Sequence, residues 1–311
     1  MPRTPHPRLR PSTPVVRRSS GRVQIGVGSG SVVLDVDEAG RRFLASLTGE
    51  HPLAVLASAA GLRVPVAQRL VRSLELAGLL AGVTSLADRT VKVVGCGLLG
   101  SRLVRLLVRA GLRRVLLADD DPADPAVHMA SRPGSSNADA LADRLSRDLT
   151  PGKARVEAQV LAHWTKPDGA RPDLTVVATD APECDRAITD TLARDDLAHL
   201  LLRGQDDGVV VGPFVRPGCS SCVRCADLHR RDRDPAWPAV LHQLSRVGGR
   251  PGSPVAEWGA ATTATQVLAW ADGRRPETWG ATLELSGRDW VTRLRTWPVH
   301  PQCGCAGLGP S

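Results

Sequence analysis

The sequence predicts an α/β protein: a doubly wound Rossmann-like sheet, preceded by a small winged-helix-like α+β module and followed by a four-cysteine metal site. Three observations carry this prediction. Short apolar strands alternate with amphipathic helices from Val91 onward, which is typical of a parallel sheet covered by helices. A Gly-x-Gly-x-x-Gly motif at 95–100 joins the first strand of this series to its helix. A Cys-x-x-Cys pair at 222–225 and, far downstream, a Cys-x-Cys pair at 303–305 have the spacing of metal ligands.

Length and composition restrict the class of protein. A chain of 311 residues allows a small domain together with a large one. Hydrophobic residues make up 42%, but no apolar run approaches the roughly 20 residues that a membrane span needs. The N-terminal residues do not have the pattern of a secretion signal. We therefore expect a cytoplasmic protein that does not enter a membrane.

The net charge of +8 raises the question of nucleic-acid binding. Nearly all basic residues are arginines scattered along the chain, and the sequence has no tyrosine and two phenylalanines to stack on bases. We therefore expect no nucleic-acid partner. One local cluster of arginines lies in the first 22 residues, which are also rich in proline and predict a flexible basic arm: Arg3, Arg8, Arg10, Arg17, Arg18 and Arg22.

The next segment, residues 23–86, predicts the winged-helix-like module. Two β-rich runs around a Gly-Ser-Gly turn in 22–36 indicate a hairpin. Three helical patterns follow, at 38–47, 52–61 and 65–80. An accessory domain that only packs on its neighbour is the alternative to a binding module.

Strand and helix patterns then alternate in a domain expected at 88–306. Strands are predicted at 91–95, 113–121, 155–160 and 173–180, with helices at 98–111 and 138–149. Further β-rich runs at 198–204 and 209–217, helices at 235–244 and 255–271, and two amphipathic strands lead to the last cysteines.

The glycine motif predicts a phosphate-binding turn. Gly95 allows the tight turn, Gly97 lets the backbone approach a phosphate, and Gly100 lets helix and strand pack closely. Acidic residues end the second strand, where a ribose-binding carboxylate belongs: Asp119, Asp120 and Asp121. The alternative is a glycine turn kept for packing in a fold that has lost its ligand.

Thr179-Asp180 ends a later strand, so the Asp180 carboxylate is expected at the carboxyl edge of the sheet. There it is a candidate for holding Mg²⁺. The alternative role is the N-cap of the helix that follows.

The cysteine spacing predicts a closed tetrahedral zinc site formed by Cys222, Cys225, Cys303 and Cys305. Cys219 is a nearby spare ligand that leaves the assignment open. A redox dithiol at 222 and 225 is disfavoured because no βαβ unit of the thioredoxin type precedes it. Cys96 and Cys184 are interpreted as buried filler.

Together these segments resemble the ubiquitin-activating-enzyme-like adenylyltransferases, the family of ThiF and MoeB, over roughly residues 88–306. The resemblance implies ATP, Mg²⁺, a structural zinc and a homodimer. It places Gly95, Gly97 and Gly100 at the ATP phosphates, Asp119 at the ribose with Asp121 beside it, and Asp180 at Mg²⁺.

Two cations of the family pattern are missing from this sequence. An Asn-x-x-Arg motif after the acidic strand end falls on Val127 and Ala130, and Arg132 is close but out of register. A lysine that balances phosphate charge falls on Asn137. Since phosphoryl chemistry depends on such cations, the adenylation site is interpreted as eroded.

The N-terminal module resembles the PqqD-like elements that bind a leader peptide as an added strand. Its fusion to a ThiF-like domain is similar to the leader-binding partners of azole-forming cyclodehydratases. The first hypothesis is therefore a protein that binds a precursor peptide and presents it to a cyclodehydratase. The second is an active ATP- and Mg²⁺-dependent adenylyltransferase that acts on the C-terminal carboxylate of a peptide or small protein, with Arg132 or an arginine from a dimer partner replacing the missing cations. A nicotinamide-dependent oxidoreductase is disfavoured because it leaves both cysteine pairs unexplained.

Overall fold

The computed structural model divides the chain into two compact units, Met1–Val83 (unit 1) and Thr84–Ser311 (unit 2). Each unit has its own hydrophobic core and is described by itself. The structure describes residues 6–10, 13–18, 21–81, 86–129, 131–148, 156–165, 171–249 and 251–305.

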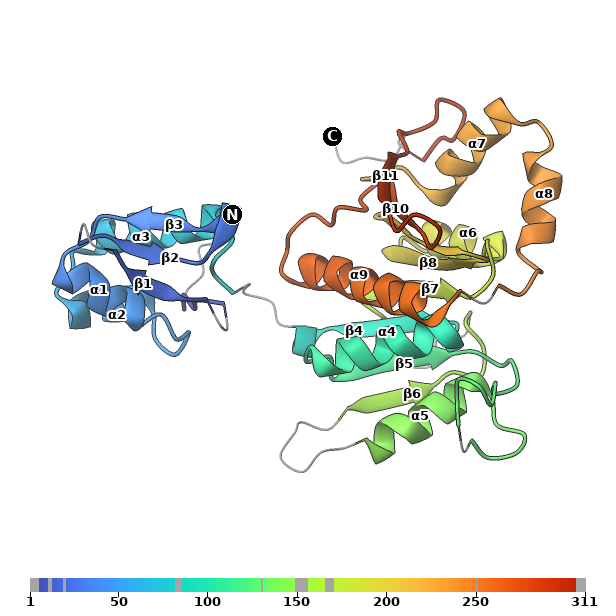
Figure 1. Ribbon diagram of the computed structural model, residues 1–311, viewed down its shortest axis with the longest axis horizontal. Coiled ribbons are helices and arrows are strands. Elements are labelled where there is room, and N and C mark those ends of the chain that lie inside the picture. Colours follow the sequence, from blue (N-terminus) through green and yellow to red (C-terminus); the bar gives the residue numbers. More distant parts are fainter. Residues whose placement is uncertain are drawn as a thin grey trace. The chain divides into compact units, whose positions relative to one another are not determined.

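Unit 1 combines a three-stranded antiparallel sheet with three helices (Figure 1). The sheet has the order β1-β2-β3, with β1 at Val15–Arg17, β2 at Val23–Ile25 and β3 at Val32–Leu34. The helices are α1 (Glu38–Ala45), α2 (Leu53–Ala60) and α3 (Val64–Leu76). The predicted hairpin and the three helices are therefore present.

Strand β1 lies inside the segment that the sequence predicted to be a flexible arm. Val16 pairs with Gln24 of β2, and residues 8 and 9 form bridges to Thr48 and Leu80. The reason is local: two consecutive β-branched valines favour an extended strand, and pairing with β2 satisfies their backbone groups. The proline- and arginine-rich composition around them hides this signal.

The helices of unit 1 have clear start and stop signals. The Asp37 side chain accepts the Gly40 N–H at 2.8 Å and caps α1. Gly61, with φ 78°, ends α2 in the left-handed region. Phe43, Leu44 and Leu74 are fully buried and belong to the core of the unit.

Unit 2 is built on an eight-stranded sheet of order β11-β10-β9-β8-β7-β4-β5-β6. Five neighbouring strands, β8, β7, β4, β5 and β6, are parallel, whereas β9, β10 and β11 are added antiparallel. This confirms the predicted doubly wound α/β fold. The strand bounds are β4 Thr90–Val94, β5 Arg114–Ala118, β6 Glu157–Val160, β7 Leu174–Thr179, β8 His199–Gln205, β9 Gly208–Val215, β10 Ala281–Ser286 and β11 Thr292–Thr296.

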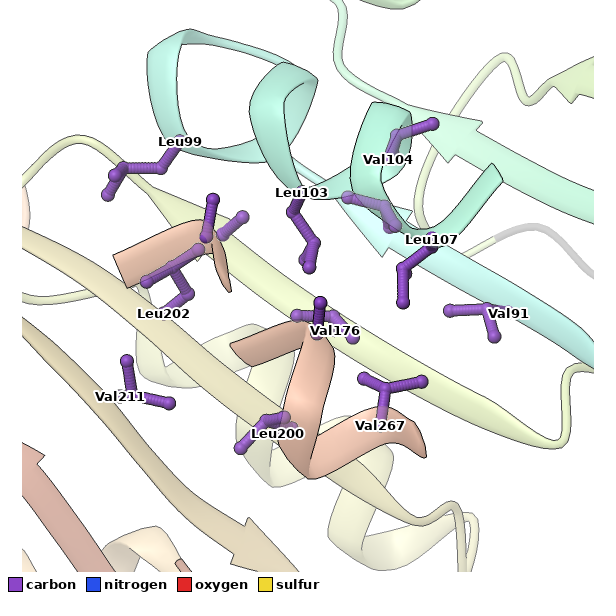
Figure 2. Close-up of a cluster of buried hydrophobic side chains, with 14 of the residues drawn as sticks. Val91, Leu99, Leu103, Val104, Leu107, Val176, Leu200, Leu202, Val211 and Val267 are labelled. Carbon is purple, nitrogen blue, oxygen red and sulfur yellow. The ribbon is translucent and has the colours of Figure 1, made fainter. Parts of the chain in front are cut away.

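Helices α4 (Leu98–Arg109) and α9 (Ser253–Ala271) pack side by side over one face of the sheet (Figure 1). Figure 2 shows the core between them, where Leu103 and Leu107 of α4 and Val267 of α9 meet Val176 and Leu200 of the strands. These side chains are fully buried, so this cluster stabilises the part of the sheet that carries the glycine motif.

The remaining helices are α5 (Asn137–Arg147), α6 (Arg186–Arg194), α7 (Val223–Arg233) and α8 (Trp237–Leu244). Val177 and Leu201 of the strands pack against Leu192 of α6 and Val223 of α7 in a second cluster. Helix α7 is absent from the sequence prediction because its segment is dominated by charged residues. Within the described residues, no single helix is long and apolar enough to cross a membrane; α2 and α3 pass that test only as a pair, which is bent by 117°.

Candidate functional site

The three motif glycines of unit 2 lie where the backbone leaves no room for a side chain. A Cβ atom on Gly95 would lie 1.8 Å from the Ala178 carbonyl oxygen, and Gly95 has φ 92°. A Cβ on Gly100 would lie 1.9 Å from the Gly95 oxygen, and one on Gly97 would lie 2.5 Å from the Asp180 carboxylate. The loop therefore has the tight turn and close packing that the motif predicts.

Two carboxylates already occupy the amide groups of this loop. Asp180 accepts the Leu98 N–H at 2.8 Å through Oδ2 and the Leu99 N–H at 2.9 Å through Oδ1. Asp119 accepts the Cys96 N–H at 2.6 Å. The positive end of α4, which attracts phosphate in nucleotide-binding folds, is therefore bonded to the protein's own anions.

One of the two roles expected for Asp180, the N-cap of the helix that follows it, is wrong. The helix that follows it, α6, is capped by Asp185, whose side chain accepts the Ala187 N–H at 2.9 Å. Asp180 caps α4 instead, because the ends of β4 and β7 are neighbours in the sheet. Its expected role as a Mg²⁺ ligand stays a prediction.

Asp119 is half-buried at the end of β5. Burial raises its pKa, although hydrogen bonds from the backbone of Cys96 and Asp121 and from Asn137 favour the ionised form. Asp121 lies beside it with an exposed side chain, and its N–H donates to Asp119 Oδ1 at 3.1 Å. The two carboxylates predicted to bind a nucleotide therefore lie together.

The loop borders a cavity of about 400 Å³ with an acidic lining. Among the residues that line it, one arginine, Arg246, faces five aspartates: Asp119, Asp120, Asp121, Asp180 and Asp185. Asn137, on which the lysine of the family pattern falls, also lines the cavity, but its side chain is neutral. The surroundings of the loop thus favour cations over a polyphosphate.

Arg132 is not among the residues that line this cavity. Its side chain is 83% exposed, lies 3.7 Å from Asp143 and borders a neighbouring cavity that also contains Asp119 and Asp120. Val127 is half-buried on the same connection, and Ala130 lies outside the described residues. The structure therefore does not bring the predicted arginine to the glycine loop.

Sequence reasoning missed several residues around the loop. His128 is buried, and its Nε2 donates to the Cys96 carbonyl at 2.9 Å. This hydrogen bond holds the backbone of the glycine loop in place. The backbone of residues 245–249 approaches from α8, and a Cβ on Gly249 would lie 2.2 Å from the Asp180 oxygen. The double glycine at 248–249 was the available signal for this close approach.

A buried ionic network supports the wall of the cavity beside α6. Glu183 is 4% exposed and pairs with Arg203, Arg186 and Arg230. Burial alone would raise its pKa, but the three arginines lower the pKa of Glu183 to about 2. Arg186 also makes a bidentate pair with Asp227, at 2.6 and 2.9 Å, so α6 and α7 are joined.

The four predicted metal ligands come together at the start of α7, where Cys222 is the N-cap residue and Cys225 lies in the first turn. The sulfur atoms of Cys222, Cys225, Cys303 and Cys305 all lie within 4.8 Å of one another. Cys222 lies 3.4 Å from Cys303, and Cys225 lies 3.3 Å from Cys305. Tetrahedral zinc with Zn–S bonds of about 2.3 Å needs sulfur separations of about 3.8 Å, so the cluster is consistent with zinc.

The thiols of the cluster interact with one another. A hydrogen bond from the Cys222 thiol lowers the pKa of Cys225 and raises the pKa of Cys222. The buried His300 ring is held by Asp232 at 2.8 Å. Cys219 is exposed and does not belong to this cluster, so the predicted ligand set stays Cys222, Cys225, Cys303 and Cys305.

Comparisons with known proteins show the fold. No family model matches the chain, and no curated protein matches it in sequence. Among solved structures, the microcin C7 biosynthetic enzyme MccB in complex with N-formylated MccA covers 97% of this chain and 99% of its own, with a TM-score of 0.63 and 15% identity. The fold is ThiF-like.

Two further structures agree with this result. Escherichia coli MccB with ATP covers 97% of this chain and 99% of its own, with a TM-score of 0.65 and 14% identity. PaaA covers 93% of this chain and 99% of its own, with a TM-score of 0.59 and 17% identity. The similarity therefore extends over both units, at identities that bear on the fold alone.

Proposed function

We propose that this chain binds a precursor peptide of ribosomal peptide biosynthesis through unit 1 and presents it to a cyclodehydratase-type enzyme, while its glycine-loop site no longer activates ATP. The observation that carries the second part is the bonding of the loop. Asp180 and Asp119 occupy the amides of Leu98, Leu99 and Cys96.

The electrostatics of the cavity support an eroded site. Adenylation needs cations that stabilise charge on the phosphates and on the leaving pyrophosphate. The cavity is lined by one arginine and five aspartates, and Arg132 is not among its lining residues. A nucleotide would have to displace Asp180 and bring its counter-ions with it.

Within the described residues of unit 1, β3 is an edge strand of the sheet, and this edge supports peptide binding. The Gly26 N–H donates to the Pro14 carbonyl, and the Arg18 N–H donates to the Arg22 carbonyl. Hydrogen-bonded and non-hydrogen-bonded pairs alternate along an antiparallel ladder, so the pair Val16–Gln24 between them is also hydrogen-bonded. The N–H and C=O of Gln24 therefore point toward β1. Its partner Val33 in β3 therefore directs its N–H and C=O away from β2, toward the edge of the sheet. Val33 is 41% exposed, and an extended peptide would pair there as a fourth strand.

Structural similarity supports the same proposal. MccB, which this chain resembles over both units, has been solved with the peptide MccA. The four-cysteine cluster would hold a structural zinc that stabilises the C-terminal segment. Formation of a homodimer stays a prediction.

The second candidate function is adenylation of a peptide carboxylate. The retained glycines, the position of Asp180 and the existence of an MccB complex with ATP favour it. In this case Asp180 would leave the loop amides and hold Mg²⁺ instead.

One experiment separates the two functions. ATP–pyrophosphate exchange and nucleotide calorimetry are measured on the full chain with Mg²⁺ and with synthetic precursor peptides encoded beside its gene. We expect peptide binding without exchange in the wild type and in Asp180→Ala. Peptide-dependent exchange that disappears in Asp180→Ala would instead establish the enzyme.

A further inference from the structure

A small cavity of about 110 Å³ lies between α4, α5 and residues 126–128 of the connection from β5 to α5. Its lining includes Arg102 and Arg105 of α4 and Arg144 of α5. Within the described residues it shares no lining residue with the glycine-loop cavity. Neither the proposed peptide-binding edge nor the proposed loss of ATP chemistry makes use of it.

Helix geometry brings the three arginines to one place. Arg102 and Arg105 stand three residues apart on α4, so their side chains leave the same face of this helix. Leu141 and Arg144 have the same spacing on α5, and Leu141 is fully buried and also lines the cavity. Two helices that are anchored in the core of unit 2 therefore hold these basic groups together.

Arg105 is a half-buried arginine without a counter-ion. It makes no hydrogen bond and no ion pair within the described part of the chain. Burial, followed by the like charges of Arg144 and Arg109, lowers the pKa of Arg105. Asp148 and Glu257 act in the opposite direction but do not cancel this effect. The charged form of Arg105 is therefore not fully compensated by the protein.

The charges around the cavity add up to a positive site. Among the described residues that line it, three arginines face one acidic residue, Glu257, which accepts from Arg102 Nε at 2.8 Å. Asp148 lies 3.7 Å from Arg144 but is not among the lining residues. With His128 counted as neutral, the lining has a formal charge of +2, which becomes +1 when Asp148 is included.

A compact oxyanion matches the cavity in size and charge. A liquid water molecule takes up about 30 Å³, so the cavity has room for one phosphate-sized group and not for a nucleoside. A phosphate group carries close to two negative charges near pH 7, and its oxygens point in several directions, so that it can accept from guanidinium groups on both helices. A carboxylate has one charge and two oxygens in one plane, which makes it the poorer match.

We propose that this cavity binds a phosphate group, which accepts hydrogen bonds from Arg105 and Arg144 while Arg102 stays paired with Glu257. Two sources share this chemistry: free inorganic phosphate and the terminal phosphate of a larger molecule. The inference goes beyond the proposed function and does not depend on it.

The test uses the full chain in a phosphate- and sulfate-free buffer of low ionic strength, where exposed charges are screened least. Isothermal titration calorimetry measures the binding of three probes: inorganic phosphate, glycerol 3-phosphate and acetate. We expect inorganic phosphate to bind roughly tenfold more tightly than acetate, because it makes a further charge-assisted hydrogen bond. Equal affinity for glycerol 3-phosphate identifies the terminal phosphate of a larger molecule, and a preference for inorganic phosphate identifies the free ion.

Variants assign the binding to this cavity. Arg105→Gln/Arg144→Gln should weaken phosphate binding about tenfold or more, because two charged donors are lost. The control is Arg147→Gln, which changes an exposed arginine of α5 that does not line the cavity, and it should keep the wild-type affinity.

Melting temperatures separate a ligand-binding role of Arg105 from a structural one. Phosphate should raise the melting temperature of the wild type but not that of the double variant. In phosphate-free buffer, Arg105→Gln should be at least as stable as the wild type, because the repulsion from Arg144 and Arg109 is removed.

Four results would overturn the proposal. They are acetate binding as tight as phosphate binding, absence of saturable phosphate binding to the wild type, unchanged phosphate affinity in the double variant, and a loss of stability in Arg105→Gln without phosphate. No peptide is present in these measurements, so their failure leaves the proposed function untouched.

Discussion

The Asp180 carboxylate and the Leu99 N–H are 81 residues apart in sequence and 2.9 Å apart in the structure. This bond and its companion to Leu98 join the end of β7 to the start of α4. The helix thereby gains a cap that comes from a neighbouring strand.

Removing this cap should destabilise unit 2. For Asp180→Ala we expect a loss of about 1–2 kcal/mol in the free energy of unfolding, because two amides at the start of α4 lose their acceptor. Urea denaturation followed by circular dichroism measures it. The control is Asp120→Ala, an exposed aspartate of the same cavity, and an equal effect of both variants would contradict the capping role.

Peptide binding should depend on the outer edge of β3. Val33→Pro removes the N–H that faces this edge and should abolish binding of the precursor peptide. Val15→Pro is a matched control. Val15 and Ile25 form a non-hydrogen-bonded pair, so the Val15 N–H points away from β2, toward the opposite edge of the sheet at β1. Fluorescence anisotropy with a labelled peptide distinguishes them. If both variants bind normally, the peptide does not pair with β3.

The cysteine cluster should contain about one zinc per chain by elemental analysis. Cys303→Ser/Cys305→Ser should lose the metal and lower the melting temperature, because metal-binding energy is also folding energy. Cys219→Ser is the control, since this exposed thiol is outside the cluster. A metal-free preparation of unchanged stability would show that the thiols serve another purpose.

Glu183 should make stability depend on acid pH. Its pKa is lowered from 4.5 to about 2 in the folded protein, so the folded state binds this proton less readily than the unfolded state. The resulting stabilisation, about 3 kcal/mol, is fully present above pH 4.5 and is lost as the pH falls toward 2.

The variant Glu183→Gln leaves the buried Arg203 without its anion and should reduce stability at pH 7 by about 3–5 kcal/mol. Urea titrations at pH 7 and pH 3 should then show a smaller pH effect than in the wild type. Glu257→Gln, which changes an exposed partner of Arg102, should resemble the wild type in both titrations.

The sequence predicted the elements whose signals are local. Alternating strands and helices, the glycine turn and the cysteine pairs each follow from spacing, and the structure confirms the α/β fold and assembles the four thiols. Strand β1 was missed because two valines in a proline-rich context give a weak signal that pairing with β2 strengthens.

The candidate site was less predictable because it depends on contacts between distant segments. Asp180 had two expected roles, and neither included the cap of α4, which requires knowing that β7 lies beside β4. Arg132 was placed near the phosphates by sequence distance, but its side chain is directed to Asp143. The Glu183 network joins α6, β8 and α7 and leaves no spacing pattern at all.

The separate cores of the two units determine how cooperatively the chain unfolds. Phe43 and Leu44 belong to a cluster made of unit 1 residues, and Leu103 and Val267 belong to one made of unit 2 residues. Each cluster is confined to its own unit, so we expect each unit to unfold as a cooperative system with its own unfolding temperature. Calorimetry should therefore resolve two heat-absorption peaks, of which only the one from unit 2 moves when the cysteine pairs lose their metal.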